Sequence, residues 1–246
     1  MTSNSAIYSK TIEEKPLGMK AYGSIPHLPG SRTGPEDHCI SVGQAKICTE
    51  RARDNRDLIV VQEKVDGSCV AITKINGLIL PLTRSGWKAA SSPFRMHKMF
   101  HRWAMQRQDI FQEILEEGER LVGEWLAQAH GTKYNLPGQP FVAFDIMKKH
   151  VRKTTEEVKL RLSSYLNYLD FIHIVHVGGP LGIEEALRRV QNDNAFGAID
   201  PVEGVVWRVE RGNRVDFLTK YVRPDKIDGC YLPEKYGDVE IWNWVG

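Results

Sequence analysis

A single lysine stands where its side-chain amine could act as a nucleophile. The segment Glu63-Lys64-Val65-Asp66-Gly67-Ser68 directly follows the apolar run 58–61, which predicts Lys64 at the point where a strand ends and a turn begins. A free lysine has a pKa near 10.4, so only roughly one amine in 2,000 is neutral at pH 7. Nucleophilic attack by Lys64 therefore requires neighbouring cations and partial desolvation to lower its pKa. The same segment fits a surface hairpin with an Asp-Gly turn equally well.

Two apolar strands each carry a carboxylate. Glu124 lies in Gly123-Glu124-Trp125-Leu126, where an unpaired charge would be costly, so we expect ribose hydroxyls or a neighbouring arginine as its partner. Phe144 precedes Asp145 in the run 141–146 and offers either a ring for stacking on a base or a core side chain. Both strands therefore combine a polar group with apolar surroundings, as a nucleotide site requires.

Cations and a third carboxylate occur at strand ends. Arg84, in Thr83-Arg84-Ser85-Gly86, is suited to a ribose or a phosphate, although a plain turn has the same composition. Glu203 begins an apolar run and is well placed for a hard divalent metal bound to phosphate oxygens. Lys220 and Arg223 end the run 217–223, where they would hold a phosphate and lower the pKa of Lys64, unless this is a solvated edge strand.

In this order, the segments from Lys64 to Arg223 resemble the signature motifs of the covalent nucleotidyltransferase superfamily, which comprises DNA ligases, RNA ligases and mRNA capping enzymes. The chain is most similar to nick-sealing ATP-dependent RNA ligases. Phe144-Asp145-Ile146 and Lys220-Tyr221-Val222-Arg223-Pro224 carry that resemblance, and the segment 27–32 adds weaker support.

The resemblance implies an α+β nucleotidyltransferase fold, an adenylation domain with an ATP-grasp-like ligase core in which the adenylate lies between two antiparallel sheets flanked by helices. It implies ATP with Mg²⁺ or Mn²⁺ as cofactors, and Lys64, Glu203 and Lys220 as catalytic residues, with Glu203 serving the metal. The implied nucleotide-binding residues are Glu63, Asp66, Gly67, Arg84, Glu124, Phe144, Lys220 and Arg223. Among them, Glu63 would help to hold the adenine.

The sequence departs from the family pattern in three places: a phosphate contact, the contact to the nucleic-acid end, and the C-terminal domain. Val222 stands where many relatives have a second lysine, so the cation that completes the phosphate clamp is left open. Cys69 stands where some RNA ligases have an asparagine near the nucleic-acid end. Only 23 residues follow Arg223, too few for the OB or helical domain of larger relatives, so any such function is absent or supplied by an accessory protein.

The implied reaction is that of an ATP-dependent RNA ligase. AMP would join Lys64, pass to a 5′-phosphate end of RNA or of a nicked duplex, and be displaced by a 3′-hydroxyl. The alternatives are a compact ATP-dependent DNA ligase, a guanylyltransferase that prefers GTP, and a non-catalytic nucleic-acid-binding relative.

The net charge of +2 does not by itself indicate nucleic-acid binding, so local basic clusters must carry that prediction. These clusters lie at 46–56, 88–102 and 148–153. Trp87 at the edge of the second cluster and Phe94 within it are candidate rings for stacking on bases, or core side chains. His97 and His101 are four residues apart without an evident third ligand, which predicts a helix surface.

The remaining features predict a single domain over residues 1–246 in an intracellular, cytoplasmic protein. The four cysteines lack metal-site or disulfide spacing, and the first 20 residues lack the apolar run of a signal peptide. Residues 1–57 are rich in Gly, Pro and polar residues and are predicted as loops with short strands.

Strands of antiparallel sheets and three helices must position these residues. Strands are predicted at 58–62, 69–74, 78–82, 121–126, 141–147, 171–177, 204–209 and 215–222. The first helix is predicted at 99–118, with Gly118 as its end, and the third at 183–191. The second is predicted to begin at the capping-box pattern of Thr154 and to have one apolar side, formed by Val158, Leu162, Leu166 and Leu169.

Overall fold

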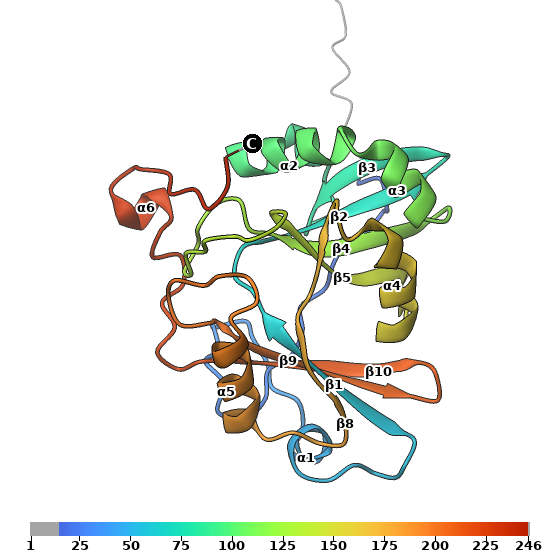
Figure 1. Cartoon of the computed structure of the whole chain (residues 1–246), viewed down its shortest axis with the longest axis vertical. Helices are drawn as coiled ribbons and strands as arrows, with labels where there is room; N and C mark the ends of the chain where they lie inside the picture. The colour runs from blue at the N-terminus through green and yellow to red at the C-terminus, as the bar shows by residue number, and fades with distance from the viewer. Residues whose placement is uncertain (1–14, 246) are drawn as a thin grey trace, which may run out of the picture.

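Lys64 ends a strand of one sheet, and four residues later Ser68 begins a strand of another. The computed structural model, which describes residues 15–245, has two sheets that face each other across this crossing (Figure 1). Sheet A has the order β10-β9-β1-β8 and consists of β1 (Asp57–Lys64), β8 (Ile174–Gly178), β9 (Gly204–Arg211) and β10 (Val215–Val222). Sheet B has the order β3-β2-β4-β5-β6 and consists of β2 (Ser68–Ile75), β3 (Leu78–Thr83), β4 (Glu119–Trp125), β5 (Phe141–Lys148) and β6 (Val151–Arg152).

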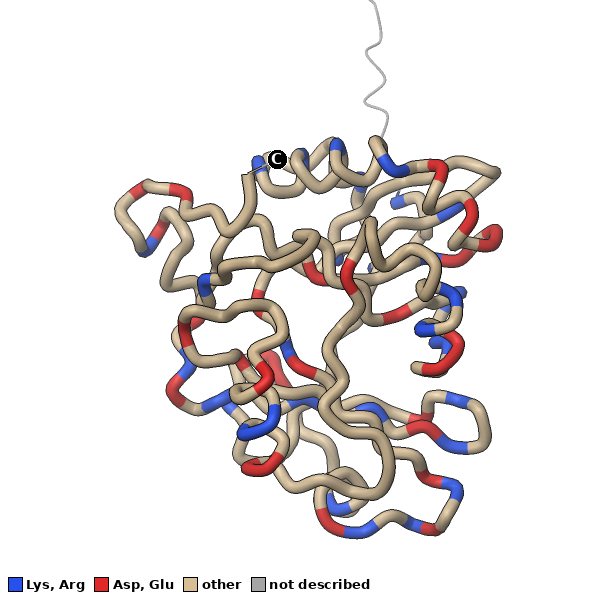
Figure 2. Tube along the Cα trace, in the orientation of Figure 1, with Lys and Arg blue, Asp and Glu red and all other residues tan. Residues whose placement is uncertain are grey.

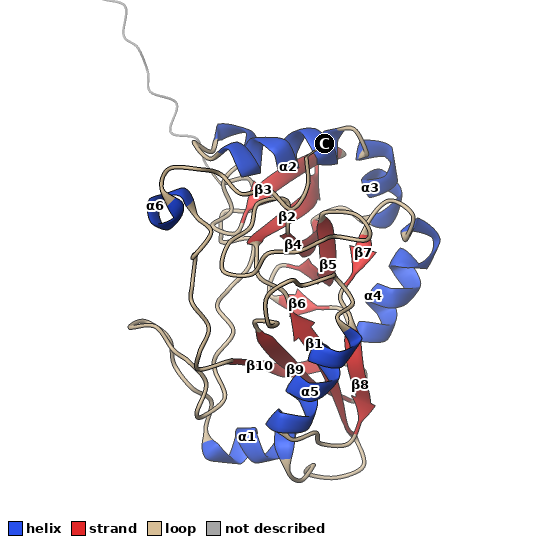
Figure 3. Cartoon of the chain, turned by 60° about the vertical axis from the view of Figure 1, so that its left-hand side comes forward, coloured by secondary structure: helices blue, strands red, loops and turns tan. Residues whose placement is uncertain are grey.

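Helices cover the outer faces of the sheets (Figure 3). The helices beside sheet B are α2 (Arg95–Met105), α3 (Gln108–Ile114) and α4 (Thr155–Leu162), while α1 (Val42–Thr49) and α5 (Ile183–Asp193) lie beside sheet A. Short 3-10 turns occur at η1 (Ala89–Ser91) and η2 (Ser163–Tyr165), and α6 (Pro233–Tyr236) lies in the C-terminal segment. The predicted α+β class with antiparallel sheets is confirmed, with one small exception, a parallel pairing of β7 (Asp170–Phe171) with β5.

Each sheet has its own buried cluster. Phe100 and Trp103 of α2 pack on Trp125 and Phe141 of sheet B, with ring centroids 5.4 to 5.8 Å apart across the two elements. The cluster of sheet A is centred on Trp207, whose ring N–H donates to the carbonyl oxygen of Leu181 at 3.0 Å. Burying large aromatic side chains in this way supplies most of the energy that fixes helices on a sheet.

The prediction of one helix over 99–118 is wrong, because the structure has α2 and α3 with a break at Gln106 and Arg107. The break lets Trp103 of α2 and Phe111 of α3 enter the same cluster, with ring centroids 5.9 Å apart. Gly118 lies four residues beyond α3, in a turn with a φ of +77°.

The predicted strand 171–177 is also wrong as a single element. Its first part, β7, joins sheet B, and its second part, β8, joins β1 of sheet A. The chain therefore crosses between the sheets a second time, at Ile172 and His173, beside the crossing that follows Lys64. An alternating pattern shows that residues are buried but not which sheet buries them.

Two helix boundaries differ from the predictions. The capping box at Thr154 is confirmed, but α4 ends at Leu162, so Leu166 is exposed and does not continue its apolar side. The loop-rich segment before Asp57 contains α1, which begins with a capping box of Ser41 and Gln44. Its first 14 residues lie outside the described part of the chain.

The segment from Lys20 to Arg32 bridges both sheets at their edges. The backbone N–H of Leu28 donates to the carbonyl oxygen of Lys220 at 2.8 Å, and the N–H of Ala21 donates to that of Arg84 at 2.9 Å. This segment therefore closes one side of the space between the sheets. Within residues 15–245, no helix is long and apolar enough to cross a membrane.

Candidate active site

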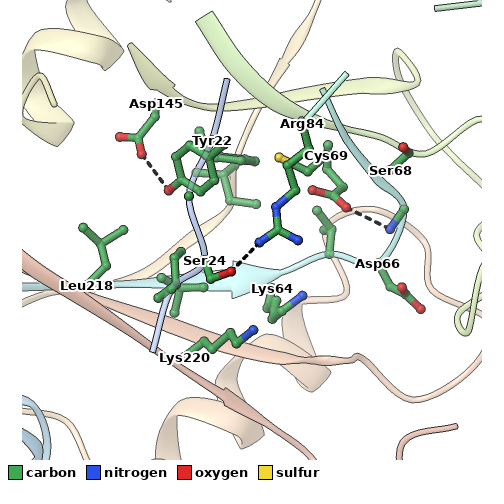
Figure 4. A pocket seen from close by; sticks show the side chains of 18 of the residues that line it. Tyr22, Ser24, Lys64, Asp66, Ser68, Cys69, Arg84, Asp145, Leu218 and Lys220 are labelled. Atoms are coloured by element: carbon green, nitrogen blue, oxygen red, sulfur yellow. Dashed lines mark hydrogen bonds between the residues drawn. The ribbon is translucent and has the colours of Figure 1, made fainter. Parts of the chain in front are cut away.

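A cavity of about 700 Å³ lies between the two sheets, where β1 passes into β2 (Figure 4). Eight of the ten predicted site residues line it: Glu63, Lys64, Asp66, Gly67, Arg84, Glu124, Phe144 and Lys220. Glu203 reaches it through its contact with Lys64. These residues come from β1, β4, β5 and β10 and from the turns that follow β1 and β3, so the fold gathers positions that are far apart in the sequence.

Lys64 and Glu203 form the central ion pair. Their Nζ and Oε2 atoms are 2.6 Å apart. Strand pairing explains the contact, because Lys64 lies opposite Gly204 in the ladder of β1 and β9, directly beside Glu203. The predicted position of Lys64 at a strand end is confirmed.

The electrostatics of Lys64 differ from the prediction. Burial acts to lower its pKa, but the carboxylates Glu203 and Glu124 outweigh burial and hold the pKa well above its usual range. The expectation that neighbouring cations depress the pKa of Lys64 is therefore wrong for this arrangement. Burial and the charge of Lys64 instead lower the pKa of Lys220. This arrangement favours the ammonium form of Lys64, with Glu203 as its nearest carboxylate.

Glu124 and Gly67 connect β4 to the turn after Lys64. The carboxylate of Glu124 accepts the backbone N–H of Gly67 at 3.2 Å, and burial raises its pKa to about 8 against the opposing charge of Lys64. No arginine pairs with Glu124 among residues 15–245, so that alternative does not hold. A Cβ atom at position 67 would lie 2.5 Å from the carbonyl oxygen of Trp125, so only glycine allows this approach.

Asp66 is occupied by protein donors. Its Oδ2 accepts the backbone N–H of Gly131 at 2.8 Å and the ammonium group of Lys226. Lys226 is buried and also donates to the hydroxyl of Thr132 at 2.7 Å. No sequence pattern marked Lys226, since no spacing rule connects it with a turn 160 residues earlier.

An aromatic wall faces an apolar one across the cavity. Phe144 packs edge-on against Tyr22, with ring centroids 5.2 Å apart. Val206 and Leu218 of sheet A line the opposite side, and Ile172 lies at the second crossing. The spacing of two sheets with apolar side chains on both is suited to a flat ring. Tyr22, in the loop-rich N-terminal segment, had no sequence pattern that marked it.

Glu63 is a buried carboxylate whose Oε2 has no hydrogen-bond partner among the described residues. Burial, with a smaller effect of Asp193, raises its pKa to about 8. An N–H donor on a ligand would satisfy this oxygen.

Residues 57–222, more than half of the chain, match the family model described as RNA ligase. The chain belongs to the RNA ligase family. No curated protein matches it in sequence.

Several solved structures are similar to this RNA ligase family member. An archaeal ATP-dependent RNA ligase, form 1, has 22% identity and a TM-score of 0.48, with 80% of this chain and 48% of that chain covered. A Naegleria gruberi RNA ligase mutant with ATP and Mn has 17% identity and a TM-score of 0.48, with 68% and 50% covered. A putative ATP-dependent DNA ligase from Aquifex aeolicus has 21% identity and a TM-score of 0.45, with 67% and 43% covered. The chain thus spans half or less of the length of these three structures.

Arg223 is the predicted site residue that the structure places outside the cavity of this RNA ligase family member. Its guanidinium donates to the carbonyl oxygens of Val202 and Pro201 and pairs with Asp225 at 2.7 Å. Two other cations line the cavity: Lys20, and Arg84, which donates to the hydroxyl of Ser24 at 3.0 Å. These two are therefore the candidates for the second phosphate contact that Arg223 does not supply.

His97 lies on a helix as predicted, but its side chain lines the cavity instead of the outer surface. Its two ring nitrogens lie 2.9 Å from the Ser68 hydroxyl and 2.7 Å from the Ser92 hydroxyl. His130 also lines the cavity and was not singled out. The start of α2 therefore forms part of the rim.

The chemistry of the site suits a divalent metal held mainly by a substrate. The described residues contain no group of three His, Cys, Asp or Glu side chains arranged for a metal. Glu203, with Glu124 close enough to affect the same lysine, supplies hard oxygen donors. Mg²⁺ is commonly bound by one or two carboxylates together with phosphates and water, so the residues fit such an ion.

Proposed function

We propose that the protein is an ATP-dependent RNA ligase that forms a lysyl-AMP intermediate on Lys64. The observation that carries the proposal is the position of Lys64 at the crossing between the sheets, inside a cavity whose walls supply a ring, carboxylates and cations. Membership of the RNA ligase family supports the same reaction class.

The side chains that line the cavity support one arrangement of bound ATP. The adenine lies between Phe144 and the apolar pair Val206 and Leu218, with an amino N–H donated to Glu63. The ribose hydroxyls meet Glu124. This pose places the α-phosphate beside Lys64, at the end of the sheet.

The first chemical step joins AMP to the protein. The ammonium of Lys64, whose Nζ lies 2.6 Å from Oε2 of Glu203, first loses a proton to solvent. The neutral amine then forms the P–N bond while the bond from the α-phosphorus to pyrophosphate breaks. Lys220 and Arg84 neutralise charge on the phosphates.

A divalent metal held by Glu203 and the phosphates would neutralise negative charge and offset the carboxylate field that keeps Lys64 protonated. In the later steps, the protein positions a 5′-phosphate end that takes AMP from Lys64 and a 3′-hydroxyl that displaces it. Arg84 and His97 at the rim face the entry of these ends.

Incubation of the protein with Mg²⁺ and α-labelled ATP, followed by denaturation, tests the first step. We expect label on the wild-type chain and on Lys148→Ala, an exposed lysine on sheet B, and a loss of at least about 10³-fold in Lys64→Ala. Wild-type protein that takes label from GTP alone, or from neither nucleotide when mass spectrometry excludes a preformed adenylate, would contradict the proposal. Label that persists in Lys64→Ala would contradict the nucleophile.

Ligation itself is tested on nicked duplexes. A 5′-phosphate nick with ribonucleotides on the 3′-hydroxyl side should be sealed faster than its all-DNA counterpart. Equal or faster sealing of the DNA nick would instead assign the protein as a DNA ligase.

A further inference from the structure

One stretch of the chain has a charge that the overall composition hides. Residues 67–108 contain seven Lys and Arg residues and no Asp or Glu, although the whole chain has a net charge of only +2. Figure 2 shows basic residues along α2 in this stretch. Lys88, Lys98 and Arg102 are exposed and form no ion pair with any residue in the range 15–245. Their charge is therefore available to an external anion.

Two aromatic rings in the same stretch are exposed. Phe94 is 56% exposed and Trp87 is 40% exposed, with the ammonium of Lys15 5.1 Å from the Trp87 ring centroid, and both rings lie on the connection between β3 and α2. Sequence composition left core packing open for both, and the structure excludes full burial. Large rings left in solvent beside unpaired cations are typical of surfaces that stack bases.

The rings are continuous with the cavity. Phe94 packs at a right angle on His97, with ring centroids 5.7 Å apart, and His97 lines the cavity. Trp87 follows Ser85, another lining residue, by two positions, and its carbonyl oxygen accepts the backbone N–H of Thr83 at 2.8 Å. A chain of contacts therefore leads from the cavity to each exposed ring.

We propose that Trp87 and Phe94 form a stacking surface for unpaired bases of the nucleic-acid strand whose end enters the cavity. Lys88, Lys98 and Arg102 follow the phosphates of that strand. This inference rests on the proposed function for the identity of the end, but the binding surface itself is a separate property. An acidic protein partner would use the cations without needing two solvent-exposed rings, so the rings favour a nucleic acid.

Fluorescence anisotropy with a labelled, 5′-phosphorylated single-stranded RNA of about 12 nucleotides tests the surface without ATP. We expect the Kd to rise roughly 10-fold in Phe94→Ala and in Trp87→Ala, as for the loss of one stacked base. Phe94→Tyr should stay within about twofold of wild type, since the ring is kept. Tyr168→Ala is the matched control, because Tyr168 is 48% exposed and lies between η2 and β7, away from the cavity lining.

The salt dependence of RNA binding tests the cations separately from the rings. The slope of log Kd against log salt should fall by about one in Lys98→Gln. Alanine variants that bind within twofold of wild type, or a Phe94→Tyr variant as weak as Phe94→Ala, would overturn the stacking surface. An unchanged salt slope in Lys98→Gln would overturn the phosphate path along α2. Absence of label on Lys64 in the wild type would overturn the proposed function alone, because anisotropy measures binding directly.

Discussion

Two buried groups of charges lie between the sheets, and they are built differently. In the first, which we call the sheet lock, Asp145 of sheet B accepts from Arg208 of sheet A at 2.5 Å, and also from Arg152 and the hydroxyl of Tyr22. Arg208 pairs in addition with Glu210 at 2.7 Å. In the second, the site cluster, Lys64 is the one cation among residues 15–245 in contact with Glu203, and within the same range Glu124 has only a backbone donor.

The sheet lock holds the fold, and the site cluster contains the groups that can react. Arginine keeps its proton and binds carboxylates with several fixed donors, so the sheet lock is permanent. Both oxygens of Asp145 are satisfied by protein groups, so Asp145 is not free to bind a ligand. A lysine amine can lose its proton and its partner, and the site cluster leaves carboxylates with raised pKa values. Such unfavourable groups persist where a ligand or a reaction uses them.

Arg208→Met should have the largest effect, because it leaves the buried Asp145 without its main partner. We expect a loss of about 3–5 kcal/mol in the free energy of unfolding, equivalent to a fall in Tm of roughly 10 °C. Circular dichroism melting measures this, with the exposed Arg188→Met as the control. A Tm within 2 °C of wild type would show that Arg208 does not lock the sheets.

Glu63→Gln tests the raised pKa of the unpaired Glu63 carboxylate in the cavity. The folded pKa of Glu63 is about 8, above its ordinary value, so its neutral form stabilises the fold fully below about pH 4.5 and this stabilisation is lost as pH rises through 8. Glutamine does not titrate. The variant should therefore gain about 4 kcal/mol on wild type between pH 5 and pH 9. A Tm difference that stays constant across this range would contradict the raised pKa.

Glu203→Gln sharpens the comparison at Lys64 itself. Removing the carboxylate that raises the pKa of Lys64 should increase the fraction of Lys64 that is neutral. The rate at which an amine-reactive acylating reagent modifies Lys64 at pH 8 should therefore rise about 10-fold. Peptide mass spectrometry measures the modification of Lys64, with Glu234→Gln on the exposed α6 as the control. Labelling by ATP should fall in the same variant, because a proposed metal ligand is lost. An unchanged acylation rate would mean that Glu203 does not control the amine.

The sequence by itself determined the local elements and the order of the chemical groups. Alternating and apolar runs gave β1, β2, β3, β4, β5, β9 and β10 to within a few residues, and the pattern at Thr154 predicted the start of α4. The position of Lys64 at a strand end followed from the apolar run before it. Each of these depends on contacts between near neighbours, which periodicity and capping report directly.

Only the tertiary structure decided which groups meet. It split the run 171–177 between two sheets, turned Arg223 away from the cavity and placed Lys226 on Asp66. It also reversed the expected direction of the Lys64 pKa, because that value depends on Glu203, which is 139 residues away in the chain and 2.6 Å away in space. Burial and charge pairing are properties of the assembled sheets, and no local pattern encodes them.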